Sequence, residues 1–126
     1  MKVALAGAGA NIVGLSLDDG AATAAAVADR GTESVQLVGD TSVPADHEQA
    51  ADAAIEAFGR LDIWVNNAAR PLVKPFLATT EDEWHDLLAV NLFGYVWGCR
   101  TAAGRMAAAG GGRIVNVSSA ADVQPL

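Results

Sequence analysis

Basic side chains, cysteine and long apolar runs are all scarce in this 126-residue sequence. Eight lysines and arginines stand against fifteen acidic residues, which gives a formal charge of −7 and a pI near 4.5. This balance argues against the broad basic surface that nucleic-acid binding uses. A phosphate-bearing small ligand is still compatible with it, because backbone N–H groups bind phosphate without net basicity.

The single cysteine, Cys99, permits no internal disulfide. With the scattered His47 and His85 it gives no metal-ligand pattern, so no metal site is predicted. Its neighbours Trp97 and Gly98 suggest a helix interior, which favours a core thiol over a reactive one. The sequence has no apolar run of about 18 residues and no signal-peptide pattern at its start. We therefore expect a cytoplasmic protein that contacts neither membrane nor nucleic acid.

The content of 52% hydrophobic and 18% charged residues indicates one globular domain. Apolar runs and turn signals alternate along the chain, and residues 1 to about 8 read as the tail of a helix. Strands are predicted at 11–17, 34–38, 61–65 and 113–117, and helices at 19–30, 44–58 and 80–106. This alternation predicts an α/β fold: a doubly wound parallel sheet, Rossmann-like, with three α/β/α layers.

Polar residues follow three of the predicted strands, namely Asp40, the pair Asn66-Asn67 and the pair Ser118-Ser119. Ligands of open parallel sheets bind beyond the carboxyl ends of the strands, so these groups are expected to meet at one edge. Taken singly, Asp40 also fits a helix cap and the serines an ordinary turn. The asparagine pair is more informative, because a turn needs only one amide.

Four motifs resemble those of the classical short-chain dehydrogenases/reductases. They are Asn66-Asn67-Ala68-Ala69, Val90-Asn91-Leu92, the strand from Arg113 to Ser119, and Gly39-Asp40-Thr41 after the second predicted strand. Their order and separations agree with the family over nearly the whole chain. The resemblance implies an oxidoreductase that moves a hydride between NAD or NADP and an alcohol or carbonyl substrate.

The same resemblance assigns roles to individual residues. Ser119 resembles the serine that hydrogen-bonds the substrate oxygen, and Asn91 the helix asparagine that binds a water in the proton relay. The alternative for Asn91 is a residue that simply faces solvent. Asn67 and Ala68 resemble the stretch lying against the adenosine ribose and pyrophosphate, while Asn66 is expected to be a structural amide.

Asp40 resembles the carboxylate that recognises the adenine amino group, with Thr41 offering adjacent backbone. Ser16 occupies the position where NAD-preferring relatives carry an aspartate for the ribose 2′-hydroxyl. Serine removes a charge that would repel a 2′-phosphate, yet Leu17 and Asp18 follow rather than an arginine. The sequence therefore leaves the choice between NAD and NADP open.

The sequence also departs from the family pattern, and Ala69 in place of a glycine is the least of the departures. Residues 2–9 could also be interpreted as a first strand followed by the glycine-rich phosphate loop of the family. Two observations argue against this strand-and-loop interpretation. Ile12 occupies the third glycine position after Gly7 and Gly9, and only residues 8–11 would separate this strand from the next parallel one. The Tyr-x-x-x-Lys pair, whose tyrosine is the acid/base and proton donor in the family, is absent too, since the one tyrosine, Tyr95, lies in the long helix. We expect a catalytically incomplete segment of a longer enzyme.

The resemblance places a missing strand between the strands at 11–17 and 61–65. These two must then either close the gap or keep unpaired edges. A second interpretation is a non-catalytic subunit that joins intact relatives through the long helix, which builds homodimer or homotetramer interfaces in the family; Trp84, Leu88 and Trp97 are the residues to check. A flavodoxin-type nucleotide-binding domain shares the alternation but does not account for Asn91 together with Ser119.

We predict no dehydrogenase turnover from residues 1–126 alone, because the phosphate loop and the proton donor are missing. The measurement is NAD(P)H formation at 340 nm with a panel of alcohols, with an intact family member as the positive control. Turnover by the chain itself would refute this expectation.

Overall fold

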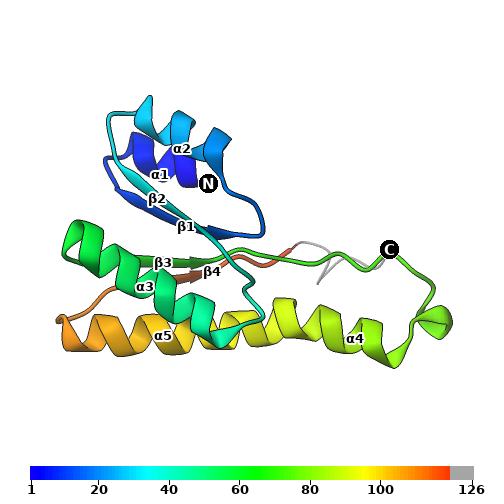
Figure 1. Cartoon of the computed structure of the whole chain (residues 1–126). Coiled ribbons are helices and arrows are strands. Elements are labelled where there is room, and N and C mark those ends of the chain that lie inside the picture. The colour runs from blue at the N-terminus through cyan, green and yellow to red at the C-terminus, as the bar shows by residue number, and fades with distance from the viewer. Residues whose placement is uncertain (120–126) are drawn as a thin grey trace. The chain divides into compact units, whose positions relative to one another are not determined.

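The computed structural model describes residues 1–119 and divides the chain into two compact units. Unit 1 is Met1–Leu61, and unit 2 begins at Asp62. Each unit combines a pair of parallel strands with helices (Figure 1). The α/β class predicted from the alternating pattern is therefore confirmed.

Unit 1 is a two-stranded parallel sheet with helices on both of its faces (Figure 1). The strands pair in register, from Ile12 opposite Ser34 to Ser16 opposite Val38. Helices α1 and α2 contact one another, and α3 packs against both strands. The elements are α1 (Lys2–Gly7), β1 (Ile12–Ser16), α2 (Ala21–Ala28), β2 (Ser34–Val38) and α3 (Pro44–Phe58).

Small apolar side chains make the core of unit 1. Ala6, Ile12 and Val27 are buried together, so α1, β1 and α2 share one cluster. Helix α3 begins with Pro44 in its first turn and ends at Gly59, whose φ of +75° suits glycine. It buries His47 and three alanines, Ala50, Ala51 and Ala54. The helical start of the chain is as the sequence predicts, and the alternative strand-and-loop interpretation is wrong.

Unit 2 places one long helical segment against a second two-stranded parallel sheet. Its strands pair from Ile63 opposite Arg113 to Asn66 opposite Asn116. Helix α5 contacts both strands. The elements are β3 (Ile63–Asn66), the 3₁₀ turn η1 (Phe76–Ala78), α4 (Glu81–Leu88), the π-helical turn η2 (Ala89–Phe93), α5 (Gly94–Ala108) and β4 (Arg113–Asn116).

The four strands within residues 1–119 pair as two two-stranded parallel sheets, as expected of a doubly wound sheet that lacks a strand. Among residues 1–119, β1 pairs with β2 alone and β3 with β4 alone, so of the two possibilities the strands keep unpaired edges. The apolar run in the predicted strand 61–65 suggests a buried strand, but Ile63 is 45% exposed and Trp64 and Val65 are half-buried. A two-stranded sheet has no inner strand, which is why an apolar run does not become a buried one.

The long helix also differs from its prediction. Its start is as expected, because Thr80 and Glu83 form a capping box. It is not one continuous α-helix, however, because a π turn at Ala89–Phe93 interrupts it around Asn91. Such turns are rare and frequently occur at functional sites.

Helix α5 approaches β3 closely at Gly98. A Cβ atom at this position would lie 2.2 Å from Oδ1 of Asn66 and 2.7 Å from Nε1 of Trp64. Both neighbours belong to a hydrogen-bonded pair in which Trp64 Nε1 donates to Asn66 Oδ1 over 2.7 Å. Glycine at 98 is therefore the condition for docking α5 on this strand.

We predict that Gly98→Ala destabilises the chain by about 1–3 kcal/mol through overpacking, although alanine is the better helix former. Gly104→Ala in the same helix is the matched control, because a Cβ there meets nothing within 4 Å. It should stabilise by about 1 kcal/mol through helix propensity. Urea unfolding of both variants measures the difference, and equal effects would contradict the close approach.

Candidate functional site

In unit 1 the carboxyl ends of both strands lie side by side. The backbone N–H of Gly39, just after β2, donates to the carbonyl of Ser16, the last residue of β1, over 2.8 Å. This bond places Ser16 next to the turn that carries Asp40 and Thr41. The structure thus brings together Ser16, Asp40 and Thr41, three of the five residues predicted to contact the cofactor.

The side chain of Ser16 is held by the turn that follows β1. Its Oγ donates to Oδ1 of Asp18 and lies 3.1 Å from both that atom and the carbonyl of Asp18. The N–H of Gly20 donates to the same carboxylate oxygen over 3.0 Å. Asp18 therefore links the end of β1 to the start of α2.

Asp40 has a structural role in its own turn. Its Oδ1 accepts the N–H of Ser42 over 2.8 Å, and its backbone N–H donates to Oδ2 of Asp46 over 2.7 Å. The carbonyl of Thr41 accepts from Nε2 of the buried His47 over 2.8 Å. The bond to Ser42 lies within the turn and is not a helix cap, because the N-cap of α3 is Val43 and carries no side-chain cap bond. It fixes the direction of a half-buried carboxylate at the strand ends.

In unit 2 Asn66 is the centre of a cluster of polar side chains. Only 6% of it is exposed, and its Nδ2 donates to Oδ1 of Asn116 over 2.8 Å and lies 3.3 Å from Sγ of Cys99. Its Oδ1 accepts from Trp64. Asn66 is structural, as expected, but it joins side chains from β3, β4 and α5. Cys99 is half-buried and lies beside these amides. The prediction of a thiol in an apolar core is therefore wrong, because the neighbours of the sulfur are polar.

Three residues with predicted roles follow these strand ends. Asn67 is exposed and Ala68 half-buried directly after β3, and Ser119 is exposed after β4. The N–H of Val117 donates to the carbonyl of Asn66 over 2.9 Å, and the carbonyl of Val117 accepts from the hydroxyl of Tyr95 over 2.9 Å. The chain leading to Ser119 is thereby fixed at Val117 on both sides.

Asn91 is exposed, as the alternative interpretation has it, but its side chain is also hydrogen-bonded to the loop after β3. Its Oδ1 accepts the N–H of Arg70 over 2.8 Å, and its Nδ2 donates to the carbonyl of Arg70 over 3.0 Å. The amide therefore holds the loop after β3 through both polar groups of one peptide position. These bonds use one acceptor and one donor position, and an amide has a second of each for a water.

Comparison with known proteins identifies the family. The family model described as "short chain dehydrogenase" matches this chain over residues 1–126. The chain belongs to the short-chain dehydrogenase family. It is 40% identical to the short chain dehydrogenase/reductase astE of Aspergillus oryzae over 126 residues, which is 96% of this chain and 48% of that protein.

Solved structures agree with this assignment. The chain superposes with a TM-score of 0.93 on a protein from Sinorhizobium meliloti assigned as a short-chain alcohol dehydrogenase, at 33% identity over 99% of this chain and 50% of that one. It superposes with a TM-score of 0.90 on xylitol dehydrogenase in its NAD⁺-bound form, at 26% identity over 99% of this chain and 49% of that one. The chain thus spans about half the length of the relatives it matches.

Asn116 was not predicted as a partner of Asn66. A signal for it exists, because Trp64-Val65-Asn66 and Ile114-Val115-Asn116 are two strands with the same ending. Parallel pairing in register puts the two asparagines opposite each other. Asp18 and Gly98 were missed as well, and for these no sequence signal distinguishes them from ordinary turn and helix residues.

The phenol of Tyr95 is half-buried and hydrogen-bonded. Burial raises the pKa of its phenol above the ordinary value of 10.0. A catalytic phenol near neutral pH needs a shift in the other direction. Its bond to the carbonyl of Val117 gives Tyr95 a structural role in unit 2.

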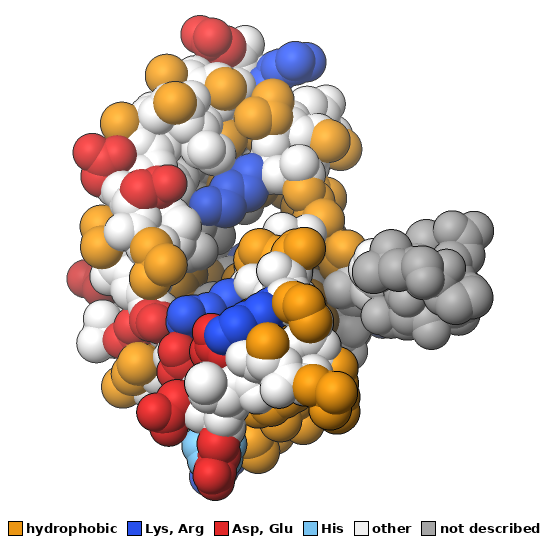
Figure 2. All heavy atoms as spheres, turned by 90° about the vertical axis from the view of Figure 1, so that its right-hand side faces the viewer, with side chains coloured by type: hydrophobic (Ala, Val, Ile, Leu, Met, Phe, Trp, Pro, Cys, Tyr) orange, Lys and Arg blue, Asp and Glu red, His pale blue; other side chains and the backbone are white. Residues whose placement is uncertain are grey.

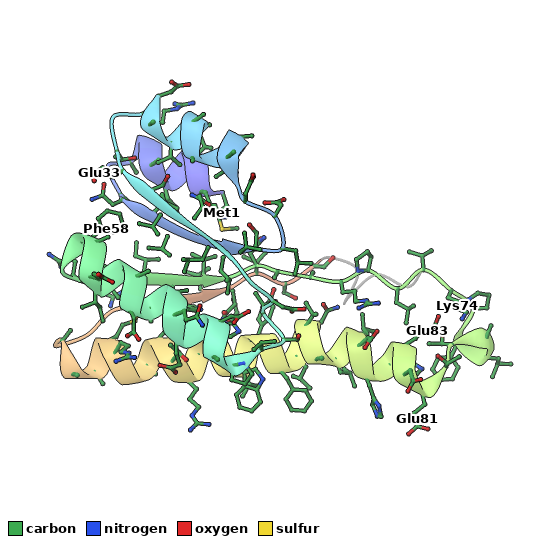
Figure 3. The ribbon with its side chains drawn as sticks, viewed as in Figure 1. Met1, Glu33, Phe58, Lys74, Glu81 and Glu83 are labelled. Carbon is green, nitrogen blue, oxygen red and sulfur yellow. The ribbon has the colours of Figure 1, made fainter. Side chains whose placement is uncertain are left out.

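Lys74 and Glu83 form an ion pair near the start of α4. Nζ of Lys74 lies 2.8 and 2.9 Å from the carboxylate oxygens of Glu83, and the two side chains adjoin where η1 meets α4 (Figure 3). The Lys74 bond, together with the N–H of Thr80, lowers the pKa of Glu83 to about 2. The ion pair ties the loop after β3 to the start of α4.

The described part of the chain also gives two negative findings. Within residues 1–119, no helix is both long and apolar enough to cross a membrane. In the same range no three His, Cys, Asp or Glu side chains are grouped so as to hold a metal ion.

We predict that Asn91→Ala releases the loop after β3. Loss of two hydrogen bonds should cost about 1–3 kcal/mol and speed amide exchange at Arg70. The measurement is hydrogen exchange by NMR. Asn11→Ala is the control, because Asn11 accepts a single backbone bond from Glu33 in unit 1. Unchanged exchange at Arg70 in Asn91→Ala would show that the π turn holds the loop by other means.

Proposed function

We propose that residues 1–126 are part of the NAD(P)-binding Rossmann-like domain of a short-chain dehydrogenase that interconverts an alcohol and a carbonyl compound. The observation that carries this proposal is the placement of polar residues at the carboxyl ends of parallel strands in both units. Ligands of open α/β sheets bind at such ends. The NAD⁺-bound xylitol dehydrogenase structure supports the same reading.

The residues present fit the adenosine half of NAD or NADP. In unit 1, carboxylates on Asp18 and Asp40 accept hydrogen bonds from hydroxyl and amino groups, and Ser16 adds a hydroxyl. In this proposal Asp40 and Thr41 contact the adenine, while Asn67 and Ala68 lie against the ribose and pyrophosphate. Glycines 7 and 9 precede β1, so they lie at its amino end and offer no phosphate cradle at this edge.

The cofactor supplies the hydride-transfer chemistry when it is bound. Ser119 donates a hydrogen bond to the substrate oxygen and stabilises the charge that develops there. Asn91 orders the loop after Ala68 through Arg70 and keeps the spare amide positions for a relay water. Tyr95 donates its hydroxyl to the carbonyl of Val117 and is not the proton donor in this proposal.

A second candidate function, assembly with other subunits, is favoured by the surface of the long helical segment. Leu88, Leu92, Phe93 and Val96 are exposed, and Phe93 stacks on Trp97 with 6.1 Å between the ring centroids. Figure 2 shows hydrophobic side chains beside acidic ones at the end of unit 2 that carries α4. In this candidate the whole protein is a cytoplasmic homodimer or homotetramer that uses this face.

Titration of the ¹⁵N-labelled chain with NADH tests the cofactor proposal. We expect amide shifts at Ser16–Asp18, Asp40–Thr41 and Asn67–Ala68, with millimolar affinity because the phosphate loop is missing. FMN is the control ligand, since a flavodoxin-type domain would bind it instead. Shifts with FMN alone, or no shifts with NADH at these positions, would contradict the proposal.

A further inference from the structure

We propose that Asp46 and His47, in the first turn of α3, are positioning residues of the cofactor site, because they set the direction of the Thr41 N–H toward the adenine. This inference rests on the proposed cofactor function, which gives the turn of Asp40 and Thr41 to the adenine. Both positioning residues lie inside a helix, where local sequence patterns do not distinguish them from ordinary helix residues.

The turn after β2 has one backbone N–H group without an acceptor. Within residues 39–43, four N–H groups are bonded: Gly39 to the carbonyl of Ser16, Asp40 to Oδ2 of Asp46, Ser42 to Oδ1 of Asp40, and Val43 to the carbonyl of Asp40. The fifth, that of the half-buried Thr41, is bonded to no acceptor among residues 1–119. A backbone donor that stays unused in a folded chain is a position for an acceptor atom of a ligand.

Two successive residues of α3 fix the peptide groups on both sides of this unused N–H. The Thr41 N–H belongs to the peptide group between Asp40 and Thr41. The peptide group before it is held by the bond from the Asp40 N–H to Oδ2 of Asp46 over 2.7 Å. The peptide group after it is held by the bond from Nε2 of His47 to the Thr41 carbonyl over 2.8 Å. The direction of the unused N–H is therefore set by α3 and not by the turn alone.

The helix that supplies these two bonds has a fixed place in unit 1. It packs against both strands, and His47 is only 2% exposed. The approach between helix and turn is close, since a Cβ atom at Gly39 would lie 2.6 Å from Oδ2 of Asp46. An imidazole donor and a carboxylate acceptor are thus held against the turn by a packed helix, which is what the support of a ligand-binding group requires.

The direction of the Thr41 N–H matters for which purine fits the turn. N1 of adenine is an acceptor and can take this N–H, whereas hypoxanthine carries a proton on N1 and an oxygen at position 6. Hypoxanthine would place a donor against the Thr41 N–H and an oxygen near the Asp40 carboxylate. A turn that is released from α3 should therefore lose discrimination between the two bases as well as affinity.

NMR titration of the ¹⁵N-labelled chain with NADH and with its hypoxanthine analogue tests the inference. The wild-type chain should bind NADH about tenfold more tightly, as expected when a hydrogen bond is replaced by a mismatch. In Asp46→Ala and in His47→Leu, NADH should bind about fivefold more weakly and the ratio should fall to about twofold. His47→Gln, whose amide can donate to the Thr41 carbonyl, should keep most of the wild-type ratio.

Two other variants of α3 serve as matched controls. Ala54→Gly weakens the same helix at a buried position about two turns beyond His47. Glu56→Ala removes one acidic charge, as Asp46→Ala does, from an exposed position near the other end of the helix. Both controls should keep the wild-type ratio.

A folded variant of Asp46 or His47 that keeps the wild-type ratio would remove that residue from the proposal. Equal binding of the two dinucleotides by the wild-type chain, or the same loss of the ratio in Ala54→Gly as in His47→Leu, would overturn the inference and leave the cofactor function intact. If neither dinucleotide shifts the amides of Ser16 and Asp40, the cofactor function fails together with this inference. If His47→Leu does not fold, Asp46→Ala and His47→Gln decide.

Discussion

The amide pair Asn66 and Asn116 is the interaction on which unit 2 depends. Two parallel strands end at the same level, and the side chains at that level bond across the pair over 2.8 Å. A buried amide is costly unless its donors and acceptors are used, and here Trp64 and Cys99 occupy the rest. The price of this arrangement is a glycine at 98, which lets α5 reach the cluster.

In unit 2, this cluster and Asn91 orient the two segments that follow β3 and β4. The carbonyl of Asn66 directs Val117 on the way to Ser119, and the Asn91 amide fixes Arg70 just beyond Asn67 and Ala68. The π turn around Asn91 is thus connected with a specific task, which is holding a loop. A rigid strand end and a clamped loop are what a site needs when it must present hydroxyl and amide groups in fixed directions.

The sequence was sufficient for much of the fold and for part of the site. Helix ends came from local chemistry at Pro44, Gly59 and the Thr80–Glu83 box, which acts within a few residues and is therefore legible in one dimension. The polar residues after the strands were predicted in the same way, from apolar runs followed by turn residues. Burial was less predictable, since Ile63 belongs to an apolar run but lies in a sheet of only two strands.

What the sequence determined by itself is the order of helices and strands, the family motifs and the acidic charge. Tertiary structure decided which polar residue does what: it gave the Asn91 amide to Arg70, tied Asp40 into its own turn, and brought the Asp18 carboxylate back to Ser16. The reason is physical. Periodicity and capping depend on neighbours in the chain, whereas a hydrogen bond between distant residues depends on a register and an approach distance that only packing sets.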